Sequence, residues 1–557
     1  MTPRELIAAF DVVADAPDGV KRLRELVLSL AVRGRLVGPD AESESAQQLL
    51  LRIGLQRKAL SLKPQRRVDA AEAPYTIPPN WTWVRFGDIF ECRLGKMLDK
   101  AKNTGDPHPY LRNANVRWGG FDLADVLEMR LEPEEVSEVS VQRGDLVVCE
   151  GGEPGRCAVW DHEVPFVIQK ALHRARPLLV DSRYYQLHLR IDCSNGRLAE
   201  LFTGATIKHL TGQMLDRHLV ALPPLAEQHR IVARVDELMA LLDRLESAHK
   251  ARDEARRAAR DAALAALRDA EDPDAVETAW ARIAEQMEEL FTEPEDVGLL
   301  RQLVLALAVR GSLVEQDESD GDAATLVRRS DAESRQASNE RWPLPHALSG
   351  HLPRIPDSWC WVALGTLLTD VQAGWSPAAL ARPKEQDEWG VLKVSACSWG
   401  QFLPDENKAL YPGTQPRPDL EVRDGDLLIS RANTAELVAR SVVVTASPRR
   451  LILSDKTLRL VPVSSVNARY LNIANLSPLA RAHYVANATG TSDSMKNVSQ
   501  AAIRETPIPL PPLPEQHRIV AKVDALMALC DALEARLRDA HALHAQLAAA
   551  AVHHLDA

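Results

Sequence analysis

Apolar residues near the end of the chain recur at alternating steps of four and three residues, the spacing that predicts a long helix with a coiled-coil seam. This seam runs through Leu547 toward the C-terminus and begins with Ile519, Val523, Leu526, Cys530, Leu533 and Leu537. A second seam starts in mid-chain, later becomes alanine-rich, and begins with Ile231, Val235, Leu238, Leu242 and Leu245. We expect the two helices to form an antiparallel pair; the alternative is that each helix packs only on its own domain.

Both seams belong to a segment of 25 residues that occurs twice, at 222–246 and 510–534, with 20 identical positions. Each copy opens with Leu-Pro-Pro-Leu, which favours a helix start because the first turn leaves the N–H of a residue unpaired in any case. A second repeated segment, at 26–37 and 303–314, is identical at 10 of 12 positions. A period near 280 residues predicts two copies of a domain set related by an approximate two-fold axis.

Two shorter helices are predicted at 23–37 and 300–314, each ending at a glycine, Gly34 or Gly311, that is suited to a C-terminal cap. The polar stretch 315–345 predicts a loose connector.

Between the helices lie two segments of strand-like sequence. Trp81 and Trp83 alternate with other residues as in a strand, as do Trp359 and Trp361, and we expect these tryptophans to be packing anchors. The predicted fold class is α+β, with two mixed α/β domains separated by the antiparallel pair of long coiled-coil helices in a pseudo-two-fold repeat. The predicted divisions are a helical segment (1–74), a first α/β domain (75–222), a long helix (223–272), a second helical segment (273–315), a polar linker (316–354), a second α/β domain (355–510) and a last long helix (511–557).

Composition narrows the functional classes. With 557 residues, 45% hydrophobic and 26% charged, the chain has room for about three or four domains and is not disordered as a whole. It has seven cysteines without a CxxC pair, and no apolar run approaches the roughly 18 residues of a membrane helix. We therefore expect a cytoplasmic protein with no membrane partner. The net charge of −11 argues against indiscriminate nucleic-acid binding.

Local polar clusters nevertheless favour DNA contact in the first variable segment. Arginine and asparagine are suited to bidentate contacts with guanine and adenine, and a glycine-rich turn lets a phosphate approach the backbone; a solvated loop or a plain hairpin turn is the alternative at each position. Glu150 is able to accept a hydrogen bond from cytosine N4. The candidates here are Lys96, Arg112, Asn113, Asn115, Arg117, Glu150, Gly152, Arg156, Lys208 and His209.

The second variable segment has counterpart clusters, although it differs most in sequence from the first. Its candidates are Lys393, Ser430, Arg431, Asn433, Lys456, Ser492, Ser494, Lys496 and Asn497. The sequence contains no GxxxxGK[ST], GxGxxG, [DN]PP[YFW] or HExxH motif, so we expect no catalytic, cofactor or metal site in this chain.

Together these features resemble the specificity subunit of type I restriction-modification systems. The resemblance covers nearly the whole chain and is carried by PPLxEQHRIVxxVDxLMAL at Pro223 and Pro511, by LAVRG at Leu30 and Leu307, and by the Gly-Asp-Leu turns at Gly144 and Gly425. The first domain departs from the family's Ser-Arg-x-Gly loop, with Cys-Glu-Gly-Gly at 149–152.

The resemblance implies two target recognition domains that each read one half of a split double-stranded DNA sequence, with the helices setting the unread spacer. It implies partners as well: two adenine methyltransferase subunits and two restriction-translocase subunits, which would carry S-adenosylmethionine, ATP and Mg²⁺. The alternatives are a specificity subunit of a methylation-only complex, or a coiled-coil scaffold without DNA contact.

Overall fold

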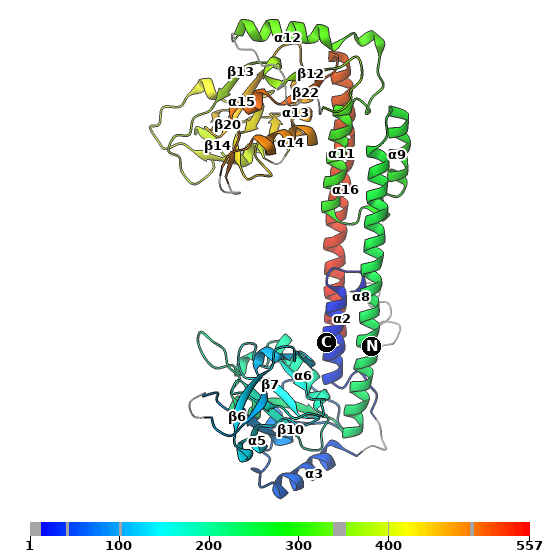
Figure 1. Ribbon diagram of the computed structural model, residues 1–557, viewed down its shortest axis with the longest axis vertical. Coiled ribbons are helices and arrows are strands. Elements are labelled where there is room, and N and C mark those ends of the chain that lie inside the picture. Colours follow the sequence, from blue (N-terminus) through cyan, green and yellow to red (C-terminus); the bar gives the residue numbers. More distant parts are fainter. Residues whose placement is uncertain are drawn as a thin grey trace. The chain divides into compact units, whose positions relative to one another are not determined.

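The computed structural model describes residues 13–39, 44–99, 103–337, 352–398, 400–490 and 495–556. The chain divides into two compact units (Figure 1). Unit 1 comprises Met1–Ala251 and His541–Ala557, and unit 2 comprises Arg252–Ala540. Each unit contains one mixed α/β domain, called here the first and the second recognition domain, together with portions of both long helices.

The first recognition domain is built from small sheets of mainly antiparallel strands, although β9 runs parallel to β3. Strands β1 (Thr82–Arg85) and β11 (Leu219–Leu222) pair with Trp83 opposite Ala221. A four-stranded sheet has the order β2-β10-β7-β8, a three-stranded sheet the order β6-β3-β9, and β4 pairs with β5. The strands of these sheets are β2 (Phe90–Leu94), β3 (Asp106–Leu111), β4 (Val116–Arg117), β5 (Gly120–Phe121), β6 (Leu127–Leu131), β7 (Leu146–Cys149), β8 (Cys157–Val159), β9 (Val167–Ile168) and β10 (Leu172–Pro177).

Helices cover the core of unit 1. They are α2 (Gly19–Val32), α3 (Ala46–Ala59), α4 (Phe86–Ile89), α5 (Pro133–Val139), α6 (Ser182–Ser194), α7 (Gly212–Arg217) and the first part of α8 (Leu225–Arg268). Apolar side chains of α2, α6 and the start of α8 join β1, β7 and β11 in one core, in which both predicted anchors of this domain lie, Trp81 buried and Trp83 at the margin.

The second recognition domain repeats this topology with little sequence identity. Strand β12 pairs with β22, and the larger sheets have the orders β13-β20-β16-β18 and β15-β14-β19. The remaining pair, β17 with β21, has no counterpart among the strand pairs that the structure describes in the first domain. The strands are β12 (Cys360–Ala363), β13 (Leu368–Ala373), β14 (Gly390–Leu392), β15 (Asn407–Ala409), β16 (Leu427–Ser430), β17 (Ala432–Asn433), β18 (Ser441–Val443), β19 (Leu451–Ile452), β20 (Thr457–Pro462), β21 (Lys496–Asn497) and β22 (Pro507–Leu510).

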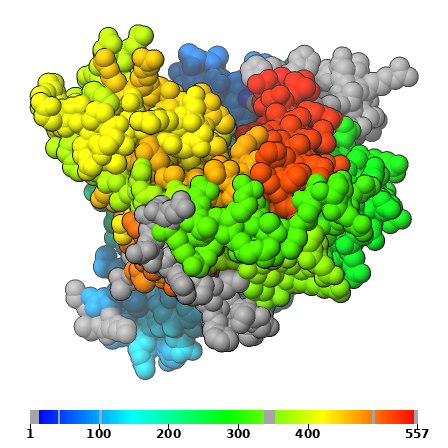
Figure 2. Space-filling model, turned by 90° about the horizontal axis from the view of Figure 1, so that it is seen from above, coloured from blue at the N-terminus to red at the C-terminus, as the bar shows by residue number. Residues whose placement is uncertain are grey.

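The helices of unit 2 begin with the end of α8. The others are α9 (Pro273–Glu285), α10 (Met287–Leu290), α11 (Val297–Arg310), α12 (Ala323–Ala337), α13 (Ala468–Leu476), α14 (Pro478–Asn487), α15 (Gln500–Arg504) and α16 (Leu513–Asp556). Figure 2 shows the red atoms of α16 directly beside the orange atoms of the elements that precede it. The predicted glycine caps are confirmed, with φ of 79° at Gly311 and 70° at Gly34. Among the described residues, no helix combines the length and the apolar character needed to cross a bilayer.

The prediction of a loose connector over 315–345 was wrong in its middle part, where α12 forms. The buried side of α12 carries serines as well as apolar residues, which hides the helical period from a hydropathy reading. The Ser330 hydroxyl bonds the Ser465 hydroxyl at 3.1 Å, and the Ser334 hydroxyl donates to Leu368 O at 2.7 Å. Hydrogen bonding thus allows a polar face to be buried.

The predicted seam residues up to Leu245 of α8 and up to Leu537 of α16 are buried or half-buried, but they pack on more than the other long helix. Ile231 and Val235 lie in the core of the first recognition domain, whereas Leu242 shares a smaller cluster with Leu23 of α2 and Ala548 of α16. In unit 2 the buried seam of α16 shares one core with α11 and with the end of α8. Within each unit the first half of one long helix therefore lies with the end of the other, which is the order of segments in an antiparallel pair.

The predicted seam does not continue unchanged to the C-terminus. Leu547 is 46% exposed, whereas Ala548 is fully buried and the carbonyl of Ala545 accepts a hydrogen bond from Arg22 Nη1 at 3.4 Å. A straight helix with 3.6 residues per turn drifts by about 20° per heptad from a strict seven-residue repeat. The contact face of α16 therefore moves away from the predicted positions after Leu537.

The repeated Pro-Pro-Leu-x-Glu-Gln segment forms a structural joint between a long helix and its recognition domain. Trp81 Nε1 donates to Glu227 Oε1 at 3.0 Å, and Trp359 Nε1 donates to Glu515 Oε2 at 2.9 Å. Both carboxylates are buried in the first turn of a helix, where the positive end of the helix dipole also stabilises negative charge. Burial raises the pKa of Glu515, and the hydrogen bond from Trp359 opposes this shift.

The neighbouring glutamine completes this helix-start clamp, defined as Glu227 with Gln228 and Glu515 with Gln516. Gln228 Nε2 donates to Pro223 O at 2.9 Å, while its Oε1 accepts from the backbone N–H of Asp181, just before α6, at 2.8 Å. Gln516 makes the corresponding bonds to Pro511 O and from the Asn467 N–H, both at 2.9 Å. Each glutamine therefore bridges the start of a long helix and the start of a helix in the recognition domain.

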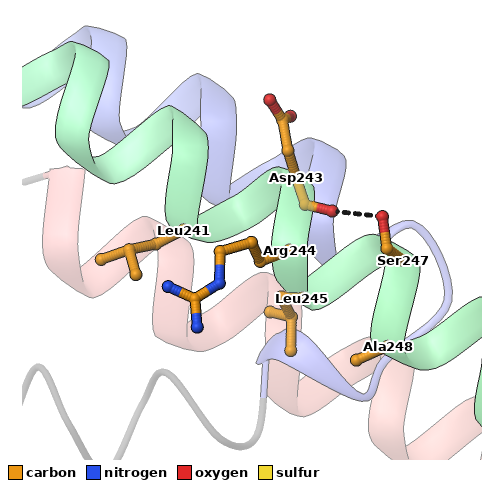
Figure 3. A pocket seen from close by; sticks show the side chains of 6 residues that line it. All are labelled: Leu241, Asp243, Arg244, Leu245, Ser247 and Ala248. Carbon is orange, nitrogen blue, oxygen red and sulfur yellow. Dashed lines mark hydrogen bonds between the residues drawn. The ribbon is translucent and has the colours of Figure 1, made fainter.

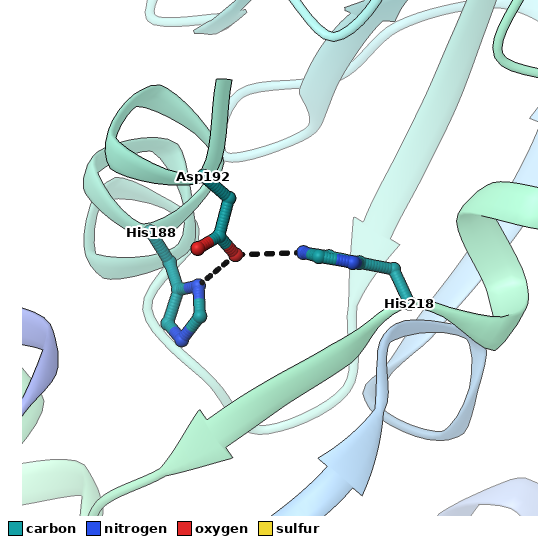
Figure 4. A group of neighbouring side chains, drawn as sticks. All are labelled: His188, Asp192 and His218. Carbon is teal, nitrogen blue, oxygen red and sulfur yellow. Dashed lines mark hydrogen bonds and ion pairs between the residues drawn. The ribbon is translucent and has the colours of Figure 1, made fainter. Parts of the chain in front are cut away.

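The first recognition domain has a further buried anchor around Asp192 (Figure 4). Asp192 Oδ2 accepts from His188 Nδ1 at 2.9 Å and from His218 Nε2 at 2.7 Å, and Oδ1 accepts from Arg197 at 2.7 Å. Burial by itself would raise the pKa of Asp192, but the two histidines hold it well below its usual range. Burial also lowers the pKa of His218, against the opposing effect of Asp192. The anchor ties α6 to the segment that leads into β11.

Replacing Gln516 with alanine is expected to lower the free energy of unfolding by about 2 kcal/mol, because Pro511 O and the Asn467 N–H lose their buried partner. Urea denaturation followed by tryptophan fluorescence measures this change. The matched control is His517→Ala on the adjacent exposed residue, for which we expect less than about 0.5 kcal/mol. Equal effects of the two substitutions would contradict the clamp.

The lowered pKa of His218 predicts that unit 1 loses stability as the pH falls below about 6.5. In that range the unfolded chain binds a proton at this histidine before the folded chain does, so acid favours unfolding. The melting temperature of the protein should fall between pH 7 and pH 5, and less steeply in His218→Gln, which keeps a donor but does not titrate. Identical pH dependence in the two proteins would rule out this contribution.

Candidate nucleic-acid interface

Three loops of the first recognition domain come together. They are the loop around Asn113–Asn115, the glycine-rich turn after β7, and the loop that leads into α7. The Leu210 N–H donates to Glu150 O at 2.7 Å, and Asn113 Nδ2 lies 3.4 Å from Gly151 O. The ring of His209 lies so close to Gly151 that an added Cβ there would be 3.1 Å from Nδ1. The fold thus gathers predicted site residues from three distant parts of the sequence.

Gly152 is required by this close approach. Its φ is 78°, and a Cβ at this position would lie 2.6 Å from Asn113 Nδ2. The glycine turn therefore serves to seat the Asn113 loop, in addition to any contact of its backbone with a ligand.

Four of the five arginines and lysines predicted for the first domain are already engaged with carboxylates of the protein. Arg112 Nη2 donates to the carboxylate of Asp125 at 2.7 Å, and Arg117 Nη2 donates to Asp122 at 3.0 Å. The remaining pairs are Arg156 with Glu153 and Lys96 with Glu135. These carboxylates orient the cations and keep the domain near neutrality, in agreement with 18 basic and 20 acidic residues over 75–222.

Two predicted base-contacting residues are buried and hold loops instead. Asn115 accepts from the Arg112 N–H and donates to the carbonyls of Asp122 and Asp125, all at 2.9 Å. Ser430 in the second domain is fully buried and donates to Leu437 O at 3.1 Å. Both residues hold the loops that carry the neighbouring candidates. We therefore correct the expectation that Asn115 and Ser430 contact bases directly.

The second domain arranges its candidate residues around the short β17–β21 pair. Asn433 lies opposite Lys496 in this pair, and Asn433 Nδ2 donates to Ser398 Oγ at 2.9 Å. Lys496 Nζ donates to Gly490 O at 3.0 Å. Asn497 is also in β21, at a half-buried position. Ser492 and Ser494 lie outside the described residues.

The remaining candidates of the two domains are lysines. Lys393 lies 3.5 Å from a carboxylate oxygen of Glu406, whereas Lys456 is exposed before β20, and Lys208 is exposed beside His209. The sequence reading missed Lys170, an exposed lysine two residues before β10, whereas Lys456 lies directly before β20. The sequence signal for Lys170 was its position shortly before the strand. The residues around it otherwise differ from the Asp-Lys-Thr that contains Lys456 in the second domain.

Glu150 and Arg431 occupy corresponding positions. Each directly follows a central strand, β7 or β16, and each is held by two backbone hydrogen bonds of the same pattern. The Glu150 N–H donates to Ala171 O at 2.8 Å and Glu150 O accepts from Leu210; the Arg431 N–H donates to Lys456 O and Arg431 O accepts from Val498, both at 2.9 Å. Neither side chain has a hydrogen-bond or ion-pair partner among the described residues. One domain therefore presents a carboxylate where the other presents a guanidinium.

The Asp192 anchor is also the one group of described residues with metal-ligand spacing. The backbone N–H of Ala221 donates to His188 Nε2 at 3.2 Å, which places the ring proton of His188 on Nδ1. Nδ1 then donates to Asp192 and has no lone pair to offer a metal. The geometry fits a hydrogen-bonded structural anchor better than a metal centre.

A shallow hollow lies along one face of α8 in unit 1 (Figure 3). It is lined by Leu241, Asp243, Arg244, Leu245, Ser247 and Ala248. All six belong to about two turns of one helix, and the side chain of Leu241 is 48% exposed. The corresponding Leu529 of α16 is 55% exposed, so the repeat includes an outward-facing leucine in each copy.

Comparison with known proteins agrees with this arrangement of two similar domains. A family model described as type I restriction modification DNA specificity domain matches residues 78–252 and 453–540. The specificity subunit of the type I restriction enzyme EcoEI from Escherichia coli is 30% identical over 565 residues, covering 95% of this chain and 93% of that protein. The EcoAI specificity subunit from Escherichia coli is 25% identical and covers 95% of this chain and 92% of its own length.

A solved structure is also similar. The HsdS subunit from Thermoanaerobacter tengcongensis is 20% identical, and the alignment covers 86% of this chain and 98% of that one with a TM-score of 0.43. The extent of identity with the EcoEI subunit shows that this chain belongs to the type I specificity-subunit family, and it is the DNA-specificity subunit of a type I restriction-modification complex rather than its catalyst.

Proposed function

We propose that each recognition domain reads one half of a bipartite double-stranded DNA sequence, through its loop cluster in the major groove. The observation that supports this most directly is the pair Glu150 and Arg431: the same backbone setting carries opposite hydrogen-bonding chemistry in the two domains. A carboxylate accepts from cytosine N4, whereas a guanidinium donates to guanine O6 and N7. Two readers on one frame then recognise two different half-sites.

The near neutrality of both domains supports reading by hydrogen bonds rather than by bulk charge. The second domain has 16 basic and 15 acidic residues over 355–510, close to the balance of the first. The proposed contacting set comprises Asn113, Arg112, Arg117, Glu150, Arg156, Lys208 and His209 in the first domain and Arg431, Asn433, Lys456, Lys496 and Asn497 in the second. Lys96 and Lys393, each beside a carboxylate, stay as proposed phosphate contacts.

We further propose that the long helices separate the two readers and set the length of the unread spacer. The repeated outward leucines, Leu241 and Leu529, support docking of two identical adenine methyltransferase subunits on equivalent faces. Two restriction-translocase subunits then complete the restriction complex. S-adenosylmethionine, ATP and Mg²⁺ belong to those partner subunits in this proposal.

Exchanging the charge at the two corresponding positions tests the reading mechanism. Glu150→Arg should change one base pair in one half of the recognised sequence, and Arg431→Glu one base pair in the other half, with about 1–3 kcal/mol of altered discrimination at each. Sequencing of methylated adenines in cells that express each variant with its methyltransferase shows the new target. The matched controls are Glu163→Arg and Arg449→Glu, at exposed positions outside the loop clusters. Changes in both halves from a single substitution would refute independent readers.

Lengthening both long helices tests the spacer proposal. Inserting four residues after Lys250 in α8 and at the matching position of α16 adds about 6 Å of helix, which corresponds to about two base pairs. The methylated sequence should then show a spacer longer by that amount with both half-sites intact. The control insertion is in the turn between α8 and α9 and should leave the spacer unchanged. An unchanged spacer in the lengthened protein would contradict the proposal that the long helices set the spacer length.

A further inference from the structure

A strongly basic segment precedes the first recognition domain. Between Glu44 and Asp69 the chain contains no acidic residue but has six cations, in a protein with a net charge of −11. They are Arg52, Arg57, Lys58, Lys63, Arg66 and Arg67. The segment comprises α3 and the extended stretch that follows it.

Two of these cations are occupied within the protein. Arg52 pairs with Glu44 at 2.8 Å. Arg57 is buried and donates to the carbonyls of Lys63 and Gly87, both at 2.7 Å. The other four, Lys58, Lys63, Arg66 and Arg67, are exposed, and none has a side-chain partner among the described residues. We call these four the basic strip.

The backbone of the basic strip is fixed to the domain. Besides the bonds of Arg57, Gln65 Nε2 donates to Leu50 O at 3.3 Å, and the Arg66 N–H lies 3.4 Å from Asp88 Oδ2. The carboxylate of Glu72 is likewise engaged, since it pairs with Arg85. The fold therefore holds an extended stretch in place while leaving its cations free, which lowers the entropic cost of binding an anion.

The basic strip is connected through two packed helices, α4 and α7, to the loop that carries Lys208 and His209. Its anchor, α4, contacts α7, and Gly87 of α4 lies against Asp216 of α7. Helix α7 begins directly after the loop that carries Lys208 and His209. Helix α7 therefore links the loop of Lys208 and His209 to α4, the helix to which the basic strip is bound.

The corresponding segment of the second copy is balanced in charge in its sequence, with five basic and four acidic residues over 322–354. Helix α12, the counterpart of α3, has Arg328, Arg329 and Arg335 over 322–337, balanced by Asp322, Asp331 and Glu333. Arg335 forms an ion pair with Asp331. A surface for one of two identical partner subunits would be expected in both copies. The asymmetry favours a ligand that continues past one end of the recognised site.

We propose that the basic strip binds the phosphate backbone of the DNA that flanks the first half-site, outside the recognised sequence. This inference rests on the proposed reading of DNA by the first domain. Four unpaired cations along an extended stretch match the regular negative charges of a duplex, and release of counterions supplies the binding free energy. The strip adds affinity without adding sequence information.

The test uses the complex reconstituted with its methyltransferase subunits and the variant Lys58→Gln, Lys63→Gln, Arg66→Gln, Arg67→Gln. Arg57 is kept because it is buried. The dependence of log K on log salt should become shallower by about 2–4, or about 0.9 for each lost phosphate contact. The methylated sequence should stay the same. As a matched pair, Arg66→Gln with Arg67→Gln should change the slope, whereas Arg328→Gln with Arg329→Gln should not.

Trimming the DNA provides the second readout. Removing the flank beside the first half-site should weaken binding of the wild-type complex and have little effect on the variant. An unchanged dependence of log K on log salt in the variant overturns the proposal. A variant that keeps the salt dependence but assembles poorly with its partner subunits overturns it as well, because the basic strip would then be assigned to a protein partner. If the wild-type complex itself fails to distinguish target from non-target DNA, the reading function fails rather than this inference.

Discussion

The buried hydrogen bonds of the helix-start clamp are the constraint on which the rest of the structure depends. A long helix that carries a DNA reader can fix the reader only if the junction between them is rigid. Trp81 and Trp359 each donate to a buried carboxylate in the first helical turn, and the adjacent glutamines bridge to α6 and α13. Because these groups are buried, losing any one bond leaves a polar atom without water or partner. The junction is therefore cooperative and intolerant of change.

This constraint explains why the repeated segment is nearly identical while the recognition domains diverge. The clamp residues interact with both the helix and the backbone of the domain, so that each side restricts the other. The loop tips face no such requirement. Glu150 and Arg431 are fixed through main-chain atoms alone, and their side chains are free to differ. The fold thus separates positions that must be kept from positions at which specificity can vary.

Charge is distributed in agreement with this division. Arginines near the loop tips of the first domain are paired with carboxylates. In the proposed function, this pairing reduces indiscriminate attraction to nucleic acid and leaves directional hydrogen bonds to discriminate bases. The basic strip is the exception, with four exposed cations on a braced backbone. On the proposals made above, affinity from phosphate and specificity from bases come from different parts of unit 1.

The sequence by itself determined the features that depend on local rules: the two long helices, the glycine caps at Gly34 and Gly311, the division into two similar α/β domains and the family resemblance. Helix starts and apolar periods are written in neighbouring residues. It did not reveal α12, because Ser330 and Ser334 are buried only by virtue of partners far along the chain. The shift of the contact face after Leu537, the internal roles of Asn115 and Ser430, and the correspondence of Glu150 with Arg431 likewise required the tertiary structure. These features arise from contacts between residues distant in sequence, for which no local pattern carries a signal.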